Sequence, residues 1–65
     1  MGEPEVIALE AELAMAHCVN SRATLSRLLE LERNPQRRQE LDYLIRELDR
    51  LERVYTRLHA RARRD

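Results

Sequence analysis

The residues of this sequence best suited to chemistry are one cysteine and two histidines. His17 and Cys18 are adjacent, and a thiol beside an imidazole is what a cysteine nucleophile and its general base require. Neighbouring residues of a helix, however, point about 100° apart, so these two side chains do not face each other. Cys18, His17 and His59 also lack the spacing of a zinc site. The pattern predicts no catalytic, metal-binding or cofactor-binding residue, and a protein that is not an enzyme.

The glycine content and the charged residues also argue against catalysis and against phosphate binding. The only glycine is Gly2, which excludes the glycine-rich loops that cradle phosphates. None of the twelve acidic residues is set among apolar neighbours as a general acid or base would be. All twelve basic residues are arginines interleaved with Glu and Asp, which would repel a phosphate backbone. We therefore expect no nucleic-acid partner, and a solvated surface laced with ion pairs.

The element that organises the chain is a predicted helix over 35–63. Asn34 can cap its first free N–H groups, and Pro35 fits its first turn, where a missing N–H costs nothing. Apolar residues then recur at alternating steps of three and four, the seam pattern of a coiled-coil helix. They are Leu41, Leu44, Leu48, Leu51, Tyr55, Leu58 and Ala62. This helix requires a partner.

A second helix is predicted over 4–32, with Pro4 in its first turn. Its seam row has the same seven-residue repeat but is small in the middle: Ile7, Ala11, Ala14, Cys18, Ser21, Leu25 and Leu28. Residues 17–24 include poor helix formers, and Asn20 or Ser21 could cap a new helix. Because the repeat runs through them without a slip, an unbroken helix is expected.

The short link at 32–34 predicts that the two helices lie antiparallel, side by side. Small Ala14 and Cys18 would then oppose large Leu51 and Tyr55, and large against small is how facing helices fill space. The expected fold class is all-α, an antiparallel two-helix hairpin that forms a single domain over 1–65.

A hairpin of this size has little core of its own. Domains below roughly 70–80 residues seldom reach more than ~3–5 kcal/mol of stability from a single core, and one cysteine cannot form an internal disulfide. Association is the remaining source of stability, and one apolar row has no partner in a two-helix hairpin. We therefore predict a partner-binding row, which consists of Val6, Leu9, Leu13, Met15 and Val19, with Tyr43 as an addition. A symmetric dimer forming a four-helix bundle would bury the same rows.

A cytoplasmic location is expected. The sequence has no apolar run near the ~18 residues of a membrane span and no basic-then-apolar start like that of a signal peptide. A single free cysteine suits a reducing compartment.

The stretch from Asn34-Pro35-Gln36 through Leu41 to Tyr55 resembles a known family. An Asn-Pro-Gln turn leads there into an apolar-periodic helix, as in the small co-chaperones of the needle subunit in bacterial type III secretion systems. The resemblance implies a cytosolic helical hairpin that binds and stabilises a helical-repeat chaperone. It also implies that this pair keeps the needle subunit from polymerising before export, and that no cofactor takes part.

Two alternatives belong to other classes. Gln39-Glu40-Leu41-Asp42, followed by Leu44-Ile45, is similar to the motif of sporulation-control phosphatases, small hairpins that dephosphorylate a response regulator. Their motif has serine where this chain has Arg38, and the resemblance implies a role for Asp42. The other alternative is a self-assembling coiled-coil adaptor, whose only partner when alone is a further copy of the chain.

Overall fold

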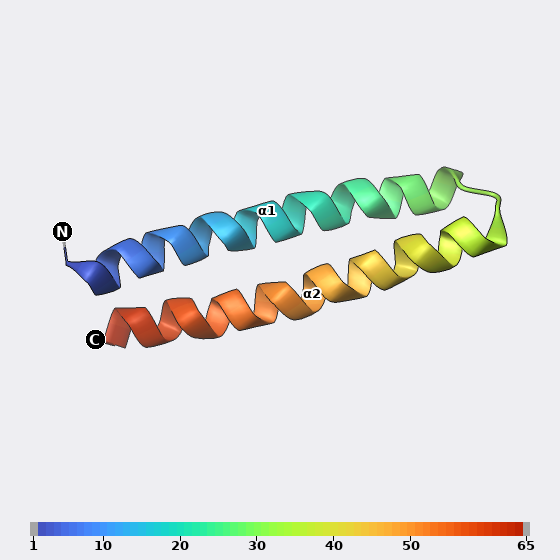
Figure 1. The fold of residues 1–65 in the computed structure, drawn as a ribbon. Helices are drawn as coiled ribbons and strands as arrows, with labels where there is room; N and C mark the ends of the chain where they lie inside the picture. Colours follow the sequence, from blue (N-terminus) through green and yellow to red (C-terminus); the bar gives the residue numbers. More distant parts are fainter. Residues whose placement is uncertain (1, 65) are drawn as a thin grey trace.

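The computed structural model describes residues 2–64, which form two long helices joined by a short turn. Helix α1 spans Glu3–Leu31 and helix α2 spans Pro35–Arg64. They run antiparallel along a molecule of 48 × 14 × 11 Å, with both ends of the chain at one end of the rod (Figure 1). The predicted all-α hairpin is confirmed, and the predicted bounds of 4–32 and 35–63 are within one residue of those observed.

Helix α1 is continuous from its start to the turn. It opens on Gly2, whose carbonyl accepts hydrogen bonds from the backbone N–H groups of Glu5 and Val6. The predicted unbroken helix is also confirmed across the segment of weak helix formers. There the hydroxyl of Thr24 donates to the carbonyl of Asn20, 3.1 Å away. This bond lies within the helix, so the threonine side chain does not compete with the helical backbone hydrogen bonds.

The turn is fixed by side chains from both helices. Glu32 leaves helical geometry, and the Oδ1 of Asn34 accepts from the backbone N–H groups of Gln36 (2.9 Å) and Arg37 (3.3 Å), which confirms the predicted cap. Arg38 reaches back from α2, and its Nη1 donates to the carbonyls of Leu29 (2.7 Å) and Glu32. A guanidinium thereby satisfies free carbonyls at the end of α1.

The helices meet along a seam that follows the expected steps of three and four. On α1 the partly or fully buried positions of this seam are Pro4, Ala8, Ala11, Met15, Cys18, Arg22, Leu25 and Leu29, followed by Glu32 at the C-cap. On α2 they are Leu41, Ile45, Leu48, Glu52, Tyr55, His59 and Ala62. About half of each predicted row is therefore correct: three of the seven residues on α1, and four of the seven on α2. They are Ala11, Cys18 and Leu25 on α1 and Leu41, Leu48, Tyr55 and Ala62 on α2.

The other half of each predicted row is wrong by one position. Leu44, Leu51 and Leu58 are exposed, and Ile45, Glu52 and His59 take their places in the seam. On α1, Ile7, Ser21 and Leu28 are likewise exposed and Ala14 is only half-buried, because Ala8, Met15, Arg22 and Leu29 face α2 instead. Either set completes a seven-residue repeat with the shared positions, so the period alone does not decide the rotation of each helix.

The seam buries little. Among residues 2–64 only Ala11, Cys18 and Ala62 are buried, at 5, 5 and 8% exposure, and no large side chain is fully buried. Small side chains let the helices approach closely but remove little apolar surface from water. The large apolar side chains of this hairpin lie mainly at its surface.

Candidate protein-binding surfaces

His17 and Cys18 lie on different faces of α1. Cys18 is buried between the helices, whereas its neighbour His17 is exposed on the outside of α1. Within residues 2–64, no three His, Cys, Asp or Glu side chains come together as a metal site would require. The structure therefore does not place the imidazole of His17 beside the thiol of Cys18.

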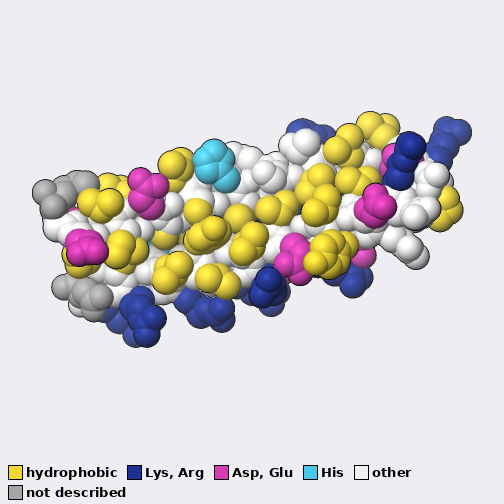
Figure 2. All heavy atoms as spheres, in the orientation of Figure 1, with side chains coloured by type: hydrophobic (Ala, Val, Ile, Leu, Met, Phe, Trp, Pro, Cys, Tyr) yellow, Lys and Arg dark blue, Asp and Glu magenta, His cyan; other side chains and the backbone are white. Residues whose placement is uncertain are grey.

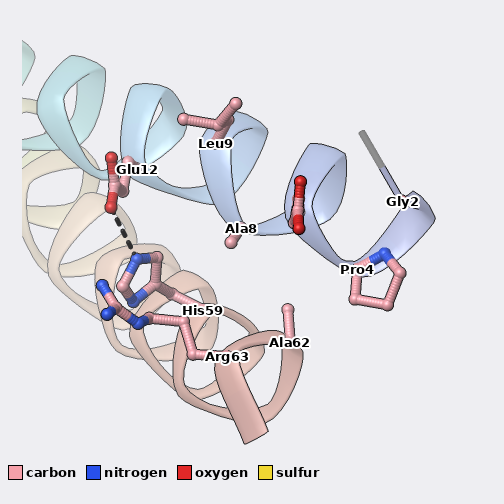
Figure 3. Close-up of a pocket in the computed structure, with 9 residues that line it drawn as sticks. Gly2, Pro4, Ala8, Leu9, Glu12, His59, Ala62 and Arg63 are labelled. Carbon is pink, nitrogen blue, oxygen red and sulfur yellow. Dashed lines mark hydrogen bonds and ion pairs between the residues drawn. The ribbon is translucent and has the colours of Figure 1, made fainter. Parts of the chain in front are cut away.

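An open groove lies where the start of α1 meets the end of α2 (Figure 3). Pro4, Ala8 and Ala62 form its floor, and Glu12 and His59 close one end through an Oε1–Nε2 contact of 2.7 Å. This polar pair joins the two helices across the seam. The groove is open to solvent, and the Glu12–His59 contact is the polar link between the helix ends that line it.

Of the predicted partner-binding row, Val6, Leu9 and Leu13 are exposed on the side of α1 away from α2. Val19 is also exposed, but it lies seven residues after Glu12 and so shares the face of the Glu12–His59 contact. Val6, Leu9, Leu13 and Val19 are each 43–55% exposed. Met15 differs, because it faces α2 and its Sδ lies 3.2 Å from the Oγ1 of Thr56.

Tyr43 is separate from this row. It is 63% exposed on α2 near the turn, whereas Val6, Leu9 and Leu13 lie near the opposite end of the rod. The structure therefore brings together three of the six predicted residues, namely Val6, Leu9 and Leu13.

One side of the seam is polar, where the seam residues Arg22, Glu52 and His59 meet their neighbours Glu12, Asp49 and Thr56. We call these six residues the polar flank. At its centre the Nη1 of Arg22 donates to the Oδ1 of Asp49 at 2.7 Å. The same nitrogen lies 2.9 Å from the Oε1 of Glu52. That second contact is an ion pair without an aligned hydrogen bond, because Glu52 Oε1 has no hydrogen-bond partner among the described residues. One cation thus holds two partly buried acids.

The opposite flank is apolar, and we call it the leucine flank: Ile7, Leu28, Leu31, Leu44, Leu51 and Leu58. Its residues on both helices come just before seam positions, which places them on one side of an antiparallel pair. Leu28, Leu31 and Leu44 line one hollow at the turn end. Figure 2 shows hydrophobic side chains along the line between the helices, with arginines along the outer edge of α2.

Most of these residues were predicted to lie in the contact between the two helices, and that prediction is wrong because they are exposed. The signal for a second surface was present, because α2 contains Ile45 beside Leu44. Two overlapping rows on one helix indicate two buried faces.

Three further ion pairs run along α2 itself. Arg46 contacts Asp42 at 3.0 Å, Arg50 contacts Glu47 at 3.2 Å, and the Nη2 of Arg53 contacts Asp49 at 2.9 Å. Exposed pairs of this kind contribute about 0–1 kcal/mol. Asp42, the acid of the phosphatase-like motif, is one of these paired residues. Arg38, where that motif has serine, is engaged with the end of α1.

Comparison of the chain with protein-family models, with curated proteins and with solved structures found no match. Across residues 2–64, neither helix contains an apolar stretch of the length that crossing a membrane requires.

Proposed function

We propose that this chain is a co-chaperone of type III secretion. It binds a helical-repeat chaperone, and the two together keep the needle subunit from polymerising in the cytosol. The observation that carries the proposal is the uncovered row on the outer side of α1, formed by Val6, Leu9 and Leu13. An apolar helix face of this length fits the grooves of helical-repeat proteins, which receive amphipathic helices.

The energetics of the hairpin support this role. With three small buried residues, the chain gains little stability from its own seam. A partner that binds only the folded hairpin stabilises it by mass action, and is itself stabilised by the same free energy. Mutual stabilisation of two chaperone subunits is the result expected of such an interface.

A mild pull-down of the tagged chain from its native host tests the proposal, with the native mass of the recovered complex. Recovery of a helical-repeat protein together with a small needle-type subunit supports it. Recovery of a response regulator instead supports the phosphatase, and Asp42→Asn then abolishes phosphatase activity. A product that contains only this chain, at a multiple of 7.7 kDa, contradicts the co-chaperone proposal.

Variants of the outer row locate the interface. Leu9→Asp combined with Leu13→Asp is expected to weaken chaperone binding by at least ~100-fold, since each change places a carboxylate in an apolar contact. Helicity should change little, because both side chains are about half exposed. Ala60→Asp is the control, as it places the same carboxylate at an exposed apolar residue outside both the row and the leucine flank. Binding that survives the double change contradicts this assignment.

A further inference from the structure

We propose that the leucine flank is the interface of a homodimer, in which two hairpins form a four-helix bundle about a two-fold axis parallel to the rod. This flank lies on the opposite side of α1 from the row assigned to the chaperone. The inference is therefore independent of the proposed function, and a dimer retains a free outer row on each copy.

The elongated hairpin exposes more surface than a compact monomer of its mass. The chain exposes 5392 Å². The size relation for folded monomers gives about 4,300 Å² for a mass of 7.7 kDa. Covering an excess of about 1,000 Å² on each of two copies would bury roughly 2,000 Å² in total, which is where the range of obligate homodimers begins.

The levels of the two helices are known from contacts across the seam. Glu12 lies level with His59, Met15 with Thr56, and Arg22 with Asp49. A two-fold axis parallel to the rod moves no residue along it, so these levels hold between copies as well. The axis also places α1 of one hairpin against α2 of the other.

Residues that meet at these levels fit one another by size. Ala14 of one copy lies level with Leu58 of the second copy, Ser21 with Leu51, and Leu28 with Leu44. At the first two levels a small residue of α1 meets a leucine of α2, which is how facing helices fill space, and at the third level Leu28 and Leu44 meet as two large apolar side chains. An axis perpendicular to the rod would instead set α1 against α1 and α2 against α2, so that the leucines of α2 would meet one another while the small residues of α1 would also meet one another.

The charges beside the flank also match. Glu10 lies level with Arg61 of the second copy, and the described hairpin contains no ion pair for either residue. Because the axis is two-fold, this acid–base contact occurs twice at the rim of the interface. Self-complementarity of size and charge identifies the occupant of the flank as a second copy of this chain.

Sedimentation equilibrium of the purified chain at ~100 µM tests the inference. The wild type is expected at twice 7.7 kDa. Leu51→Glu is expected to raise the dimer dissociation constant by at least ~100-fold, because two carboxylates would be buried at the centre of the interface. Leu13→Glu, on the outer row, is the matched control and should remain dimeric. A monomeric wild type, or a dimer that survives Leu51→Glu, overturns the proposal.

A charge swap tests the arrangement without changing any apolar contact. Glu10→Arg is expected to weaken the dimer by roughly 3–10-fold through repulsion at an exposed rim. Adding Arg61→Glu should restore the wild-type affinity. A double variant as weak as Glu10→Arg alone overturns the parallel axis. Because both residues are exposed and outside the seam, the swap stays informative even if Leu51→Glu fails to fold.

Discussion

The polar flank and the leucine flank lie on opposite sides of one seam, yet they are stabilised in different ways. The polar flank is closed within the hairpin by Arg22 bridging Asp49 and Glu52, and by His59 against Glu12. The leucine flank has no such closure, and Leu28, Leu44, Leu51 and Leu58 remain 37–47% exposed. Charges that face one another across a single seam can be paired inside one chain. A row of leucines beside a narrow two-helix seam requires another surface.

This comparison explains why so polar a seam is compatible with folding. An ion pair between Arg22 and Glu52 stabilises the seam less than two leucines would. The reason is that the cost of desolvating the two charges cancels much of their attraction. The arrangement leaves the leucines free to make a larger apolar contact elsewhere. The hairpin thus has a weak internal seam and a strongly apolar external flank.

The largest expected effect comes from placing a charge inside the seam that separates the two flanks. Ala11→Glu puts a carboxylate at a position with 5% exposure. It is expected to cost about 3 kcal/mol or more, enough to unfold a domain of this size. Ala16→Glu is the control, because it makes the same change on an exposed face of α1 and should cost under ~0.5 kcal/mol. Circular dichroism in urea measures both. Equal losses would contradict the seam described here.

A smaller effect is expected from breaking the polar flank at its centre. Arg22→Met leaves Asp49 and Glu52 without the cation between them and should cost roughly 1–3 kcal/mol. Adding Glu52→Leu removes the less exposed of the two acids left without that cation. The free energy of unfolding is then expected to return to the wild-type value or above. Denaturation at one fixed protein concentration compares the three chains. If the single variant is as stable as the wild type, the bridge does not hold the flank together.

The smallest effect concerns the turn, on which the register of both flanks depends. Asn34→Ala removes the acceptor for the N–H groups of Gln36 and Arg37, and about 1 kcal/mol of stability should be lost. Asn34→Asp keeps an acceptor and should stay close to the wild type. Thermal unfolding followed by circular dichroism separates the two. A loss shared equally by both variants would show that the cap is not the cause.

The candidate surfaces were predictable in part. Exposure of Val6, Leu9, Leu13 and Val19 follows from a second apolar row on α1, since a two-helix hairpin can cover only one. The displacement of Met15 into the seam was not predictable. It depends on Thr56 and the small side chains opposite, which the pattern of α1 alone does not contain. The polar flank was missed for the same reason, because Arg22, Asp49 and Glu52 are far apart in sequence and acquire their meaning only as neighbours.

The sequence by itself determined the local features of this protein. Asn34 and Pro35 ended one helix and began the next, the heptad spacing made both segments helical, and the short link made them antiparallel. Only the tertiary structure decided how each helix is rotated about its own axis. Leu44 and Ile45 complete the same repeat equally well, so the choice depends on which face fits the partner helix. Here the small residues of α1 and the bridge from Arg22 fit the face that carries Ile45 and Glu52, which leaves the leucines outside.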